Sequence, residues 1–172
     1  MVSLVTVDLS GYRVLAVLAL GGAVATLMTA ARRHVAGSAS LRHLLRLALV
    51  TSLIAIAGVT LIPAHQSKNE LQLRPLAEIL AAVGTGDPEL ILGVVGNILL
   101  FAPLGGVLRL QGFSWLRCLA LGASISVTIE FIQLAIPGRT TSTDDVFLNA
   151  MGVIVGYAVT GRLAVRIRTQ TK

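Results

Sequence analysis

Charged residues are scarce in this chain of 172 residues: they make up 13% of it, which is about half the share of an ordinary soluble domain. Cysteine occurs once, at Cys118, so neither an intrachain disulfide nor a disulfide scaffold can form. Aromatic residues contribute only 4%, whereas 55% of the chain is hydrophobic and its mean hydropathy is +0.84. So much apolar surface exceeds what one small soluble core can bury. The composition therefore argues against a soluble enzyme and excludes a disordered chain.

Five apolar stretches reach or approach the roughly 17–25 residues that cross about 30 Å of hydrocarbon as a helix. The first stretch lacks a basic leader and a clean cleavage site, so we interpret it as a retained helix and not as a signal peptide. The sequence predicts an all-α, polytopic helical membrane protein that forms a single membrane domain over residues 1–172. Its five predicted transmembrane spans are about residues 12–31, 44–62, 90–110, 118–136 and 146–162.

The basic residues indicate how these spans are oriented. Because positive residues are retained on the cytoplasmic side, we predict that the N-terminus lies outside and the C-terminus inside. The net charge of +6 suits anionic lipid, and the basic tail lacks the aromatic residues of a nucleic-acid-binding arm. On the predicted inner side lie Arg32, Arg33, Arg42, Arg46, Arg109, Arg117, Arg162, Arg166, Arg168 and Lys172, and on the outer side lie Arg13, Lys68, Arg74 and Arg139.

The longest predicted outer loop, about residues 63–89, contains a short apolar segment. Leucine and isoleucine residues recur between Leu71 and Leu80, interrupted by Arg74, Pro75 and Glu78. This pattern is typical of a short helix that lies in the membrane interface or dips into it. A plain extracellular loop is the alternative.

Four polar residues interrupt the last three predicted spans. Asn97 lies in the third span, Glu130 and Gln133 lie in the fourth, and Asn149 lies in the fifth. At about 1.5 Å per helical residue, they lie roughly 5–10 Å below the outer surface. Since an intramembrane charge costs about 2.5–3.5 kcal/mol on insertion scales, we expect these residues to meet in an outward-facing polar pocket.

The loop before the fifth span adds charged residues at the mouth of this pocket. Arg139 is the expected cationic partner of Glu130, and Asp144 and Asp145 are expected at the rim. The predicted ligand-binding residues are therefore Asn97, Glu130, Gln133, Arg139, Asp144, Asp145 and Asn149.

Glycines are expected to let the last three helices approach one another closely. Gly152 and Gly156 continue the face of Asn149, and Gly93 and Gly96 flank the helical turn of Asn97. Small residues at such positions favour close packing of membrane helices.

The polar residues also have a structural interpretation. Asn97, Gln133 and Asn149 can join helices through hydrogen bonds worth about 0.6 kcal/mol each, and one of the two aspartates can cap the helix that follows it. Glu130 fits this interpretation least well, because an intramembrane carboxylate is expensive. No residue spacing matches a metal site or a cofactor fingerprint, so we predict neither.

Several segments follow one another in the order of a known family. The segment from Asn97 to Gly105 reads N-x-x-x-F-x-P-x-G, and Glu130 to Gln133 reads E-x-x-Q. Gly138 and Arg139 are followed from Asp144 by D-D-x-x-x-N-x-x-G. Together with residues 69–76, these segments cover about 61–157 and resemble the VanZ-like membrane proteins. One position departs from the family, which often carries an aspartate three residues after the arginine, where this chain has Ser142.

The resemblance implies a multi-pass protein of the bacterial cytoplasmic membrane. The family is named for a member associated with low-level resistance to the glycopeptide teicoplanin, and no agreed reaction comes with it. We therefore expect the pocket to bind a polar or lipid-linked envelope group, with membrane lipids, a lipid-linked precursor or a lipoglycopeptide as partners. The alternative is an intramembrane enzyme that acts on an envelope lipid with Glu130 as its general acid or base. A transporter is less favoured, because the chain has no internal repeat.

Overall fold

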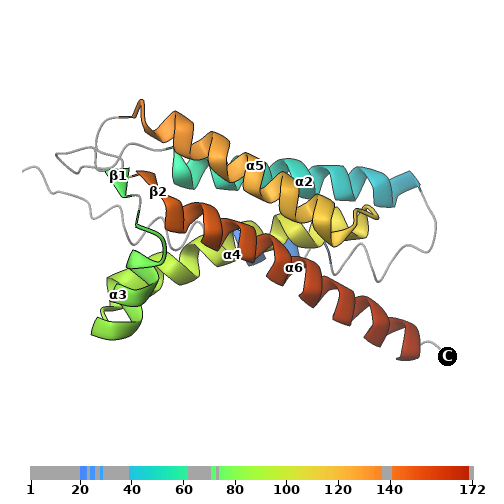
Figure 1. Ribbon diagram of the computed structural model, residues 1–172. Helices are drawn as coiled ribbons and strands as arrows, with labels where there is room; N and C mark the ends of the chain where they lie inside the picture. The colour runs from blue at the N-terminus through green and yellow to red at the C-terminus, as the bar shows by residue number, and fades with distance from the viewer. Residues whose placement is uncertain are drawn as a thin grey trace, which may run out of the picture.

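Long helices that run alongside one another form most of the described part of the chain (Figure 1). The computed structural model describes residues 20–22, 24–25, 28, 39–61, 71–72, 74–136 and 141–170. The predicted all-α fold is confirmed, with the addition of one short pair of parallel strands. The elements are α2 (Ala39–Thr60), β1 (Leu71–Gln72), α3 (Ala77–Thr85), α4 (Pro88–Leu110), α5 (Trp115–Gln133), β2 (Thr141–Ser142) and α6 (Thr143–Gln170).

Three of the described helices are long and apolar enough to cross a membrane, namely α2 from Arg42, α4 and α5. They correspond to the second, third and fourth predicted spans. The predicted span 12–31 lies mostly outside the described residues. The fifth predicted span, about residues 146–162, falls within α6, whose side chains are described only as far as Arg162.

Local capping signals decide where the helices begin. The side chain of Asp87 accepts a hydrogen bond from the amide of Glu89 at 2.9 Å, and Pro88 occupies the first turn of α4, where its missing N–H costs nothing. Ser114 caps α5 in the same way. Consequently α5 begins three residues before the predicted span and ends at Gln133, three residues before its predicted end.

Helix α4 lies at the centre of the bundle and contacts α2, α3, α5 and α6. Its closest neighbour is α6, because glycines replace side chains at their crossing. A Cβ atom at Gly152 or Gly156 would overlap the main-chain carbonyl of Ile98 or Ala102, respectively. The predicted glycine face of α6 is thus confirmed. The same expectation for Gly93 and Gly96 is wrong, since a Cβ at either position would meet nothing within 4 Å.

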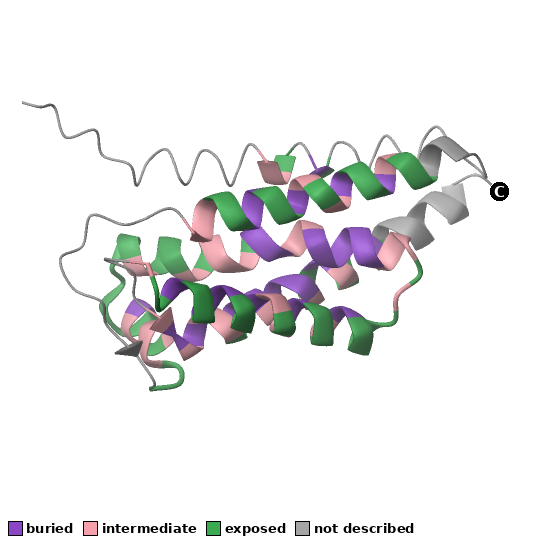
Figure 2. Cartoon of the chain, turned by 90° about the horizontal axis from the view of Figure 1, so that it is seen from above, coloured by how far each residue is buried: buried purple, intermediate pink, exposed green. Residues whose placement is uncertain are grey.

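The outer faces of the long helices are apolar. Figure 2 shows buried stripes where the helices face one another and exposed stripes on their outer sides. Large apolar side chains lie on those outer sides, among them Ile54 at 64% exposure and Phe131 at 69%. A water-soluble bundle would place polar residues there, whereas lipid is the natural solvent for such a surface.

The two ends of the bundle carry opposite charge. Within the part of the chain that the structure describes, every acidic residue lies at the end that holds α3 and the two strands (Figure 1). The opposite end carries arginines from all four long helices, and Arg74 is the described exception. The acidic residues are Glu78, Asp87, Glu89, Glu130, Asp144 and Asp145, and the arginines of the basic end include Arg42, Arg46, Arg109, Arg117 and Arg162.

Candidate functional site

Most of the predicted site residues gather at the acidic end of the bundle. There α5 contacts β2 and α6, and α6 in turn contacts α3 and α4 (Figure 1). Strand β2 immediately precedes α6 and pairs in parallel with β1, with Leu71 opposite Thr141 and Gln72 opposite Ser142. This pairing ties the segment before α3 to the segment before α6, which are far apart in sequence.

Asp144 is the most deeply buried of the predicted residues, at 1% exposure. Its carboxylate accepts hydrogen bonds from the main-chain amides of Leu76 and Glu78, the latter at 2.8 Å. It therefore caps α3 and not, as the capping interpretation proposed, the helix to which it belongs. The bond to Leu76 also holds that residue at a φ of 65°, a left-handed conformation that costs a side-chain-bearing residue about 1–2 kcal/mol.

Ser142 contacts the carboxyl groups of Glu130 and Glu78 and the main-chain amide of Asp144. Its main-chain amide donates to Glu130 Oε2 at 3.0 Å, and its hydroxyl accepts from the amide of Asp144 at 3.2 Å. Its side chain is also hydrogen-bonded to that of Glu78. Glu130, which is 7% exposed, therefore accepts a hydrogen bond from a main-chain amide of β2.

The three predicted amide residues each join two helices. Asn97 of α4 donates to Asp145 of α6. Gln133 of α5 donates to the main-chain oxygen of Thr60 in α2 at 2.8 Å, and Asn149 of α6 donates to the Ser126 hydroxyl of α5 at 2.9 Å. Their nitrogen atoms therefore serve helix packing, as the structural interpretation proposed.

Among the described residues, three buried polar atoms near this end have no hydrogen-bond partner. They are Gln133 Oε1, Asn149 Oδ1 and Thr143 Oγ1. A buried acceptor without a donor costs about 1–3 kcal/mol, and buried water or a ligand that carries O–H or N–H groups would remove that cost. These oxygen atoms can therefore accept hydrogen bonds from a ligand or a water molecule at this end of the bundle.

One prediction at this end is not tested, and two contacts there were not predicted. Arg139, the expected partner of Glu130, lies outside the described residues, so its position is not part of the described site. The contacts of Ser142 and Glu78 were not predicted from the sequence. Ser142 stands out in the sequence only as a departure from the family pattern, and nothing in the sequence places Glu78 beside it.

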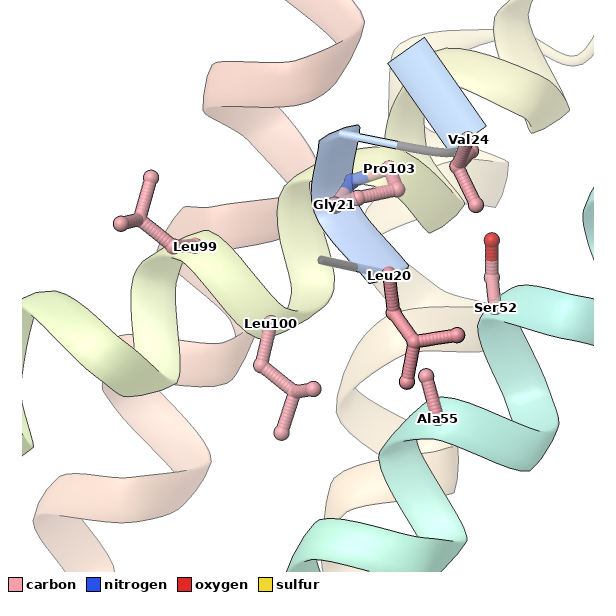
Figure 3. Close-up of a pocket in the computed structure, with 8 residues that line it drawn as sticks. All are labelled: Leu20, Gly21, Val24, Ser52, Ala55, Leu99, Leu100 and Pro103. Atoms are coloured by element: carbon pink, nitrogen blue, oxygen red, sulfur yellow. The ribbon is translucent and has the colours of Figure 1, made fainter. Parts of the chain in front are cut away.

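The described residues contain no group of three or more His, Cys, Asp or Glu side chains arranged to hold a metal ion. A hollow does lie elsewhere, in the middle of the bundle (Figure 3). Leu20 and Val24 line one side of it, and Ser52 of α2 and Pro103 of α4 line the others. Its free volume of about 10 Å³ is at the lower limit for a single water, so it is no site for a lipid chain or a drug-sized ligand.

A family model described as VanZ/LLP1 matches residues 48–164, which is more than half of the chain and includes every predicted site residue. The chain belongs to the VanZ/LLP1 family. No curated protein and no solved structure matches it. Family membership and the apolar helices together make this a VanZ-like membrane protein.

The Glu78 carboxyl gives this end of the bundle a measurable pH dependence. Burial raises its pKa above the ordinary value of 4.5, and the nearby charge of Asp144 raises it further, whereas the Ser142 hydrogen bond lowers it. With a raised pKa in the folded state, its contribution to stability is fully present below the unfolded pKa and is lost as pH rises through the folded pKa.

We therefore expect Glu78→Gln, which stays neutral, to melt at a higher temperature than wild type at about pH 7 and at the same temperature below about pH 4. Thermal unfolding of both proteins in detergent across this pH range measures the difference. Glu89→Gln is the control, since Glu89 is an exposed carboxyl in the first turn of α4. A difference in melting temperature between wild type and Glu78→Gln that did not change with pH would contradict the assignment of the effect to ionisation of Glu78.

Proposed function

We propose that this VanZ-like protein is a multi-pass protein of the bacterial cell membrane, with the acidic end of the bundle outside and the basic end in the cytoplasm. The separation of charge supports this orientation, because basic residues near the ends of spans are retained on the cytoplasmic side. On this arrangement the N-terminus is outside, the C-terminus is inside, and α3 lies at the outer surface.

Reporter fusions test the orientation. Alkaline phosphatase is active only outside the cytoplasm, and green fluorescent protein is the complementary reporter. We expect active phosphatase after Gly86, between α3 and α4, and fluorescence after Gly112, between α4 and α5, and after Lys172. The Gly86 and Gly112 fusions control for each other, since they flank the same helix. The reverse pattern would show that the acidic end faces the cytoplasm.

We further propose that the outer end binds a polar or lipid-linked envelope group and thereby contributes to glycopeptide resistance. The observation that carries this proposal is the set of buried, unpartnered polar atoms on Gln133, Thr143 and Asn149, beside a buried network of carboxylates. A ligand with hydroxyl or amide N–H groups would supply the missing donors. Arg139, which lies between Glu130 and Asp144 in the sequence, would contact an anionic part of the ligand, since guanidinium binds phosphate and carboxylate through two parallel hydrogen bonds.

Complementation of a teicoplanin-sensitive host tests the proposed binding role. We expect wild type to lower susceptibility, and Arg139→Ala and Asn149→Ala to abolish the effect at equal membrane levels. Glu130→Gln should retain part of it, because the amide oxygen can still accept from the Ser142 amide. Phe131→Leu is the matched control, since Phe131 is next to Glu130 but points out of the bundle.

Other results of this experiment would each contradict part of the proposal. Full protection by all three variants would mean that the polar residues serve packing alone. Complete loss with Glu130→Gln, together with retained protection in Arg139→Ala, would favour the alternative of an enzyme that uses Glu130 as a general acid or base. No protection by wild type would show that glycopeptide resistance is not a role of this protein.

A further inference from the structure

Arg109 lies at the basic end of the bundle in an unusually restricted setting. It occupies the last turn of α4, and its guanidinium carbon lies 4.2 Å from the centroid of the Tyr157 ring of α6. The same guanidinium lies directly over Gly161, one helical turn further along α6, where a Cβ atom would overlap its Cζ and Nη2 atoms. The Tyr157 ring and Gly161 therefore hold the planar Arg109 guanidinium against α6.

No carboxylate neutralises this group within the part of the chain that the structure describes. The described acidic residues all lie at the other end of the bundle, and Arg109 forms no ion pair with them. Instead Arg162 follows the glycine beneath it, and Arg117 lies in the first turn of α5. A guanidinium stacked by its face keeps its N–H edge available, and that edge fits two oxygens of a phosphate.

The neighbouring residues indicate the source of the phosphate. Trp115 and Leu116 begin α5, just across the α4–α5 turn from Arg109, and both are more than half exposed. An exposed tryptophan at the end of a span is typical of the interface between lipid headgroups and hydrocarbon. A Trp115 at this interface would put Arg109, across the turn from it, at the depth of phospholipid phosphates.

We propose that Arg109, held in place by Tyr157 and Gly161, binds the phosphate of an anionic phospholipid at the basic end of the bundle. This site is separate from the polar residues at the acidic end of the bundle. Its binding of lipid requires only that the protein is inserted in a bilayer. It differs from general attraction between basic residues and anionic lipid, because the position of the guanidinium matters as well as its charge.

The single tryptophan of the chain makes this testable in the full-length protein. Brominated lipids quench the fluorescence of a tryptophan that they touch, so quenching of Trp115 by brominated phosphatidylglycerol, relative to brominated phosphatidylcholine, measures the lipid preference beside Arg109. The protein is reconstituted in bilayers that contain each brominated lipid in turn. We expect wild type to prefer phosphatidylglycerol, and Arg109→Gln to lower that preference by about fivefold, the effect of one basic residue near a membrane surface.

Two further variants distinguish binding by a positioned guanidinium from attraction by net charge alone. Gly161→Ala keeps every charge but displaces the guanidinium, and Arg109→Lys keeps the charge but not the flat, stacked group. We expect both to lose most of the preference that Arg109→Gln loses, and Gly93→Ala, which meets open space in α4, to lose none.

Three outcomes would overturn the proposal. Wild-type preference in Gly161→Ala and Arg109→Lys would mean that only net charge acts. Removal of the preference by inorganic phosphate in the buffer would mean that the site takes free phosphate. Absence of quenching by either brominated lipid would mean that Trp115 does not face lipid and that the site is not at the headgroup level.

Discussion

Replacing Gly156 with alanine is expected to disrupt the packing of α6 on α4 and to lower stability by about 3 kcal/mol or more. The added Cβ would overlap the carbonyl oxygen, carbonyl carbon and Cα of Ala102. These are main-chain atoms within a helix, so no side-chain rotation relieves the overlap, and the two helices must move apart. This separation would also weaken the contact between α4 and α6 that places Asp144 and Asp145 at the acidic end. Thermal unfolding in detergent measures the loss.

Gly93→Ala is the matched control, because Gly93 also lies in a membrane-spanning helix but has nothing within 4 Å of an added Cβ. Alanine has a higher helix propensity than glycine by about 1 kcal/mol in water, so this variant should be as stable as wild type or slightly more so. Equal stability of the Gly156 and Gly93 variants would show that the close approach of α4 and α6 is not required.

Asp144→Ala is expected to release α3 from the end of the bundle. The change leaves the main-chain amides of Leu76 and Glu78 without an acceptor and also removes the contact that holds Leu76 in its left-handed conformation. Loss of a cap together with an unpaired buried donor should cost about 2–3 kcal/mol. Hydrogen exchange at residues 76–85 is the direct measurement, and we expect it to become much faster while exchange in α4 and α5 changes little.

Asp87→Ala is the control for capping in general. Asp87 caps α4 from the adjacent position and is exposed, so water can replace its carboxylate. Its loss should cost about 1 kcal/mol and should not release α3. If Asp144→Ala left exchange in α3 unchanged, the strand pairing of β1 with β2 would be sufficient to hold this helix, and the bridging role of Asp144 would be rejected.

The helices were largely predictable because their signals are local. A run of apolar residues long enough to span a bilayer identified α2, α4 and α5, and the error at the start of α5 came from neglect of the Ser114 cap. The short helix in the outer loop was also expected, although the structure places it over Ala77–Thr85, after Pro75. The same reasoning failed for Gly93 and Gly96, because spacing alone does not show which face of a helix meets a neighbour.

The sequence indicated which polar residues lie at the acidic end of the bundle but not what they contact. Costly polar residues in apolar spans pointed to Asn97, Glu130 and Asn149, and each of them has a polar partner. Their depth, estimated by counting residues from predicted helix ends, placed them near one level. Their partners lie on other helices or strands, at separations of 12 to 48 residues, and no local rule reaches so far.

The sequence by itself indicated that this protein lies in lipid and is helical, and its arginines predicted an orientation. Composition, the length of apolar runs and the placement of arginines do not depend on how the helices pack. Only the tertiary structure decided what each polar group does. Asp144 caps α3 and not α6, Ser142 contacts the carboxyl groups of Glu130 and Glu78, and Arg109 is stacked between a ring and a glycine. Those assignments depend on distances between separate helices, and such distances are set by the close packing of α4 and α6.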